Sequence, residues 1–138
     1  MPPDRTIPGS TGDWLTRAKA DLAIARAPLP EGAFYEDLCF HVQQAAEKAL
    51  KAVYQHYGWT FRYTHDLDEL INGLMQKGLI IPAEVVNADA LTTFAWEARY
   101  PSLNEPLTKS DYEEALRMAE TVVAWCEKEL AVGFHLES

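Results

Sequence analysis

The residue types that could bind an anion gather in one segment of the sequence. His41 and Lys48 lie seven positions apart, which is two helical turns, so both side chains can reach one anion lying over a helix. An imidazole and an ammonium together can hold a phosphate. Asp37 and Gln44 fall on the same side and are secondary candidates. The structural alternative is that His41 lies at a core boundary, with Lys48 paired to Asp37 or to a neighbouring helix.

Two further groups stand near predicted helix ends. His65 and Asp66 stand where a helix is predicted to begin. Asp66 is explained by stability alone, because an acidic side chain in the first turn interacts favourably with the helix dipole. His65 is a secondary candidate for the site, and the alternative is that it has only a structural role there. Arg99 and Tyr100 precede Pro101, which ends another helix. Arg99 could offset the negative end of that helix, or Arg99 and Tyr100 could stack on a base and clamp a phosphate.

Signatures of catalysis and of metal binding are missing from the sequence. There is no Gly-rich phosphate loop, no cluster with metal-ligand spacing and no Ser-centred elbow. Cys39 and Cys126 are far apart, and each falls in a helical pattern where a thiol packs as a small hydrophobe. We therefore predict no catalytic residue, no metal and no cofactor.

Helical periodicity positions these candidates and covers most of the chain. Apolar side chains recur at helical spacing in five segments, approximately 11–27, 34–57, 65–77, 82–100 and 108–133. Ser110 and Glu113 have capping-box spacing at the start of the last segment. The single β-like run, residues 79–81, is too short to form a sheet. The pattern predicts an all-α, antiparallel up-and-down bundle of four long helices plus one short helix.

Composition sets the size and the environment. The 138 residues carry a formal charge of −9 and are 48% hydrophobic, which suits one domain over 13–133, with a lead-in at 1–12 and a tail at 134–138. This acidity disfavours DNA and anionic membranes, which require clustered cations, and leaves RNA open. There is neither a signal-peptide core nor a transmembrane stretch, so the expected location is the cytoplasm.

Four motifs in register resemble the HEPN domain family. Residues 35–52 match that family's signature helix, which reads H-x-x-Q-x-A-E-K-x-L-K-A. The other matches are W-L-x-x-A-x-x-D-L at 14–22, H-D-L at 65–67 and E-A-R-Y-P at 97–101. Together they span about residues 13–130, nearly the whole chain.

The resemblance implies an all-α bundle that is commonly homodimeric and binds nucleotides or RNA. Many small prokaryotic members are encoded beside a minimal nucleotidyltransferase, in what resembles a toxin–antitoxin or stress-type system. The implied partners are therefore a second copy, a nucleotidyltransferase-like protein and a nucleotide. The positions that carry over from the family motifs are His41, Lys48, Arg99 and Tyr100.

Other HEPN proteins are metal-independent ribonucleases that use an Arg-x4–6-His motif. No His follows Arg99 at that spacing, so the resemblance does not carry nuclease activity to this chain. The expectation is a non-catalytic binding and interaction module. One alternative is a ribonuclease in which His41 or His65 lies beside Arg99 and replaces the missing histidine; another is a purely structural dimeric scaffold.

Overall fold

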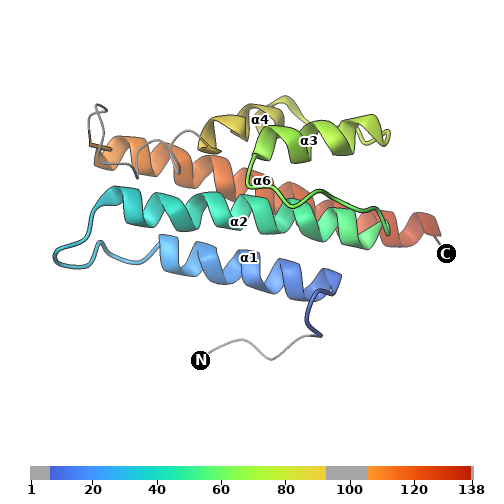
Figure 1. Cartoon of the computed structure of the whole chain (residues 1–138), viewed down its shortest axis with the longest axis horizontal. Helices are drawn as coiled ribbons and strands as arrows, with labels where there is room; N and C mark the ends of the chain where they lie inside the picture. The colour runs from blue at the N-terminus through green and yellow to red at the C-terminus, as the bar shows by residue number, and fades with distance from the viewer. Residues whose placement is uncertain (1–6, 93–105, 138) are drawn as a thin grey trace.

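All regular secondary structure in the part that the structure describes is helical (Figure 1). This computed structural model describes residues 7–92 and 106–137, with side chains up to residue 131. Its helices are α1 (Thr11–Ala25), α2 (Tyr35–His56), α3 (Leu67–Gln76), α4 (Ala83–Val86) and α6 (Lys109–Glu137). A 3-10 turn, η1 (Asn87–Asp89), follows α4. No strand occurs in these ranges, so the prediction of an all-α bundle is confirmed.

Helix α2 is the central element of the bundle. It packs against α1 on one side and α6 on another, and it also contacts α3, whereas α4 packs against α6 (Figure 1). Helix α1 runs antiparallel to α2, whereas α6 runs in the same direction as α2. The rings of Tyr35 and Tyr112 stack near the starts of α2 and α6, and the Tyr57 hydroxyl donates to Glu129 near their far ends.

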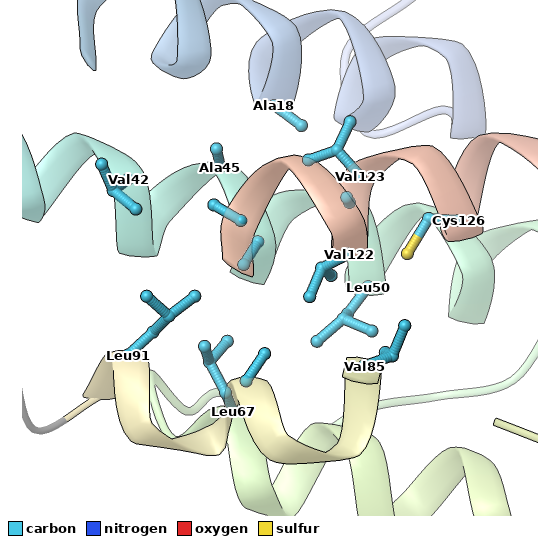
Figure 2. Close-up of a cluster of buried hydrophobic side chains, with 14 of the residues drawn as sticks. Ala18, Val42, Ala45, Leu50, Leu67, Val85, Leu91, Val122, Val123 and Cys126 are labelled. Atoms are coloured by element: carbon cyan, nitrogen blue, oxygen red, sulfur yellow. The ribbon is translucent and has the colours of Figure 1, made fainter. Parts of the chain in front are cut away.

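Helix α2 can pack closely because its inner face is made of small residues. Ala45, Ala46 and Ala49 are completely buried, and their lack of bulk lets neighbouring helices approach. Figure 2 shows Val122 and Cys126 of α6 near Leu50 of α2 and Val123 on the side of Ala18 of α1, with Leu67, Val85 and Leu91 closing the core from the side of α3 and α4. The thiols of Cys39 and Cys126 are both buried and free, as the sequence predicts.

Glycines follow two of the predicted helices, whereas α6 continues through Gly133 to Glu137, past the end predicted at residue 133. Gly58 follows α2 with a φ of 71°, and Gly78 follows α3 with a φ of 99°, conformations that L side chains rarely adopt. The cap of the last helix differs from the prediction. Thr108 and Asp111 exchange hydrogen bonds between side chain and backbone, so the capping box lies two residues before the predicted Ser110–Glu113 pair.

The predicted helix over 82–100 is interrupted within its described part. Helix α4 ends at Val86 and gives way to the 3-10 turn before helical geometry resumes at residues 90–92. Asn87 and Asp89 bracket that turn, and short polar side chains of this kind compete with helical backbone hydrogen bonds. The predicted end of this helix at Pro101 lies outside the described residues.

No helix within residues 7–92 and 106–137 combines the length and the apolar content that a membrane crossing requires.

Candidate functional site

Asp21 of α1 brings two of the predicted site residues together. Its Oδ1 lies 3.0 Å from Nδ1 of His41, and its Oδ2 accepts a hydrogen bond of 2.7 Å from Nζ of Lys48. Asp21 is buried, whereas the side chains of His41 and Lys48 are 31% and 25% exposed. We call Asp21, His41 and Lys48 the Asp21 cluster. The helical spacing therefore places His41 and Lys48 on one group, as predicted, but that group is a carboxylate of the same chain.

The Asp21 cluster compensates its own charge. A buried carboxylate needs a cation or several donors, and here one carboxylate receives both. Lys48 has three N–H donors, of which Asp21 takes one, so donors remain on its open side. The contact of Asp21 with Nδ1 of His41 directs the Nε2 edge of the ring away from the carboxylate. Sequence reasoning proposed that Lys48 could pair with a neighbouring helix, and Asp21 is that partner.

Asp37, predicted as a secondary site residue or a partner of Lys48, caps the start of α2 instead. Its Oδ2 accepts a hydrogen bond of 2.9 Å from the backbone N–H of Phe34, which precedes the first residue of α2. The carboxylate therefore caps the helix and interacts favourably with the positive end of the helix dipole. Asp37 pairs with neither His41 nor Lys48, and this contact explains it by helix stability.

A second carboxylate, Glu47 of α2, also joins a histidine to a lysine. Its Oε1 lies 2.9 Å from Nδ1 of His65, which belongs to the connector between α2 and α3. Its Oε2 accepts a hydrogen bond of 2.9 Å from Nζ of Lys51. The name Glu47 cluster is used for Glu47, Lys51 and His65 together with Gln43 and Gln44. Sequence reasoning missed Glu47 and Lys51 as site residues, although their i,i+4 spacing amid buried alanines was a usable signal.

Two glutamines extend the Glu47 cluster along α2. Gln43 donates a hydrogen bond of 2.8 Å to the backbone oxygen of His65, and Gln44 donates one of 3.0 Å to the side-chain oxygen of Gln43. The amide nitrogen of Gln44 also lies 3.4 Å from Glu47. Gln44, predicted to lie near His41 and Lys48, is thus bonded within the Glu47 cluster. Together the two clusters make one polar face along α2.

The ammonium of Lys51 is enclosed by aromatic rings. Its Nζ lies 5.5 Å from the ring centroids of Trp14, Phe61 and Tyr63, within the range of cation–π attraction. The edge-to-face contact of Trp14 with Phe61, at 6.0 Å between centroids, joins α1 to the connector after α2. The alternating aromatic residues of the connector thus help to bury a cation.

The remaining predicted site residues, Arg99 and Tyr100, lie outside the described residues. Within the ranges that the structure describes, no group of three or more His, Cys, Asp or Glu side chains is placed to hold a metal ion. The described part of the candidate site is therefore a hydrogen-bonded face with two carboxylate–imidazole pairs. Such a face can donate hydrogen bonds to a ligand, bind a partner surface, or hold imidazoles for proton transfer.

Comparisons with known proteins agree with this architecture. The family model described as the HEPN domain matches residues 11–129. The crystal structure of TT1696 from Thermus thermophilus is similar, with 30% sequence identity, a TM-score of 0.77 and coverage of 88% of this chain and 98% of that one. The structure of ST0689, an archaeal HEPN homologue, is 28% identical with a TM-score of 0.66 and the same coverages. A search of curated proteins gives no match.

Proposed function

The chain belongs to the HEPN domain family, and from this premise we propose that it is a non-catalytic, homodimeric HEPN module that binds a nucleotide. It acts with a nucleotidyltransferase-like partner protein in a toxin–antitoxin or stress-type system. The observation that carries the interaction part of this proposal is that the Asp21 carboxylate contacts both His41 and Lys48. The Asp21 carboxylate keeps the side chains of His41 and Lys48 on the open side of α2, where both can donate hydrogen bonds, and its negative charge offsets most of their positive charge.

A small ligand or a protein partner suits such a face better than a long polyanion does. Binding of long nucleic acids draws on a row of uncompensated cations. Here the basic side chains of α1 also pair within the chain, Arg17 with Asp13, Lys19 with Glu127 and Arg26 with Glu120. With a formal charge of −9, the surface favours a partner with a basic face or a ligand small enough for a few directed hydrogen bonds.

The partner part of the proposal is tested by co-expression with the protein encoded by the adjacent gene. A nucleotidyltransferase-like neighbour that co-elutes with this chain in size-exclusion chromatography with light scattering supports it. Lys48→Glu should weaken the complex, whereas Lys128→Glu, an equal charge change on the exposed side of α6, should not. Separate elution of the two proteins at micromolar concentration would remove the partner from the proposal.

The ligand part is tested by calorimetric titration of the isolated chain with ATP, GTP and AMP. Measurable heat with at least one of them supports nucleotide binding. The absence of heat with all three at millimolar concentration would remove it, whatever the outcome with the partner protein.

One observation favours a second candidate, a ribonuclease with a displaced histidine. Asp21 contacts Nδ1 of His41 and Glu47 contacts Nδ1 of His65, the geometry in which a carboxylate orients an imidazole for proton transfer. RNA cleavage in the presence of a chelator, lost in both His41→Ala and Arg99→Ala, would replace the non-catalytic proposal by this one. Intact RNA after prolonged incubation leaves the binding module as the better description.

A further inference from the structure

A pocket of about 400 Å³ lies between α3 and the connector that precedes it. The connector contributes Thr60, Phe61 and Arg62, and α3 with its C-cap contributes Asn72, Gln76 and Lys77. No member of the Asp21 cluster or of the Glu47 cluster lines this pocket. Its volume lies within the range of pockets that hold small molecules.

The two cations of the pocket, Arg62 and Lys77, are paired less closely with carboxylates than Lys48 and Lys51 of α2 are. The guanidinium of Arg62, whose side chain is 81% exposed, approaches Glu69 only to 3.4 Å, longer than the usual charge-assisted hydrogen bond. Nζ of Lys77 lies 6.0 Å from the ring centroid of Trp59, and no carboxylate partner for it occurs among the described residues. With Glu69 counted, the lining carries one net positive charge in a chain of −9.

The rest of the lining suits a flat, polar body. Phe61 offers apolar surface, and the side chains of Thr60, Asn72 and Gln76 make no hydrogen bond to any described part of the chain. Each amide presents a donor and an acceptor side by side, a pattern that matches the edge of a heterocyclic base. An aromatic surface beside such groups binds a planar ring by stacking and edge contacts.

We propose that this pocket binds a small phosphorylated molecule of mononucleotide size. Arg62 and Lys77 hold its phosphate, Phe61 contacts its ring, and Asn72 and Gln76 bond the ring's polar edge. The inference rests on the nucleotide-binding part of the proposed function and deepens it, because it assigns the ligand to a site that contains no member of the Asp21 cluster or the Glu47 cluster. It is independent of the partner protein.

The first test is a titration of the ¹⁵N-labelled full chain with AMP, adenosine and inorganic phosphate, followed by amide NMR. AMP should shift the signals of Thr60, Asn72 and Gly73, and it should bind at least tenfold more tightly than adenosine or phosphate. Shifts centred on His41 and Lys48 would keep nucleotide binding but overturn the pocket. No shift anywhere at millimolar AMP would overturn the pocket and nucleotide binding together.

The second test compares two double variants with the same charge change. Arg62→Gln/Lys77→Gln should lower the affinity for AMP at least tenfold, while Arg117→Gln/Lys128→Gln on the exposed side of α6 should leave it within twofold. All four positions are exposed, and a melting curve checks that each variant folds. Equal losses of affinity for AMP in the two double variants would show that overall charge governs the binding. Unchanged affinity in Arg62→Gln/Lys77→Gln would show that these two side chains do not contact the ligand. Either result overturns the proposal.

Discussion

The Nζ atom of Lys51 and the Oε2 atom of Glu47 form an ion pair of 2.9 Å inside the bundle, with side chains only 4% and 3% exposed. Two charges removed from water carry a large desolvation cost unless their other contacts offset it. Here His65 approaches the carboxylate and three aromatic rings surround the ammonium. The pair therefore holds α1, α2 and the connector in one arrangement.

Breaking this pair from one side should destabilise the fold strongly. Glu47→Gln leaves the ammonium of Lys51 buried without its counter-charge, and we expect a loss of about 3–5 kcal/mol in the free energy of unfolding. Urea denaturation followed by circular dichroism measures it. Glu127→Gln, which breaks the exposed pair with Lys19, should cost less than about 1 kcal/mol.

The double variant Glu47→Gln/Lys51→Met gives the sharper measurement. It removes both charges, so its loss of stability should be smaller than the sum of the two single losses. Strictly additive losses would show that the two side chains act separately.

The hydroxyl group of Tyr54 leaves no room for a side chain at position 73, so this position requires glycine. A Cβ built at this position would lie 2.1 Å from the hydroxyl oxygen of Tyr54, which donates a hydrogen bond of 2.7 Å to the backbone of Leu70. We expect Gly73→Ala to destabilise the protein by about 1–3 kcal/mol, since α3 or the tyrosine must move. Thermal melting measures the change.

Removing the hydroxyl should reverse the sign of this effect. In a Tyr54→Phe background, the next nearest atom lies 3.4 Å from the new Cβ, an ordinary contact. Gly73→Ala should then stabilise that background by up to about 1 kcal/mol, because alanine favours a helix interior over glycine. A similar loss in both backgrounds would place the steric conflict elsewhere.

Much of the architecture was accessible from sequence because it depends on local periodicity. The buried alanines of α2 and the glycines after α2 and α3 mark packing and helix ends within a few residues of themselves. The break after α4 was missed because a continuous apolar stripe outweighed Asn87 and Asp89. Partners brought together by folding were harder still. Nothing near Asp21 in the sequence indicates that it would meet His41 and Lys48 from another helix.

The two cysteines should resist alkylation in the folded protein. Burial raises the pKa of Cys39 to about 12, with further contributions from Glu36 and Asp111, and burial also raises the pKa of Cys126. Since the thiolate is the reactive form, iodoacetamide at pH 8 should modify neither thiol in the native state and both in urea. Mass spectrometry counts the adducts. Rapid modification of the native chain would contradict the burial of these residues.

Stability should decline in alkaline solution. Burial raises the pKa of Tyr54, assisted by Glu69, and burial also raises that of Tyr112. With folded-state pKa values above the unfolded ones, these tyrosines and the two buried cysteines contribute stability at neutral pH that is lost as the pH rises above about 9, because the unfolded chain releases their protons first. Urea unfolding at pH 7, 9 and 10.5 measures the decline, which should be smaller in Tyr54→Phe. An equal decline in that variant would assign the effect to other groups.

Asp21→Asn separates the two places where a nucleotide could bind. The substitution keeps the shape of the side chain but removes the charge that compensates Lys48 and His41. If the phosphate binds on the face of α2, the affinity for AMP should rise by about 1 kcal/mol, roughly fivefold. The reason is that the variant removes the repulsion between the Asp21 carboxylate and the phosphate, two charges at contact distance. If the phosphate binds in the pocket beside α3, the affinity for AMP should remain within twofold of the unmodified chain. Calorimetry with AMP gives the answer, and Lys48→Gln supplies the reciprocal control, because it should weaken binding only in the first case.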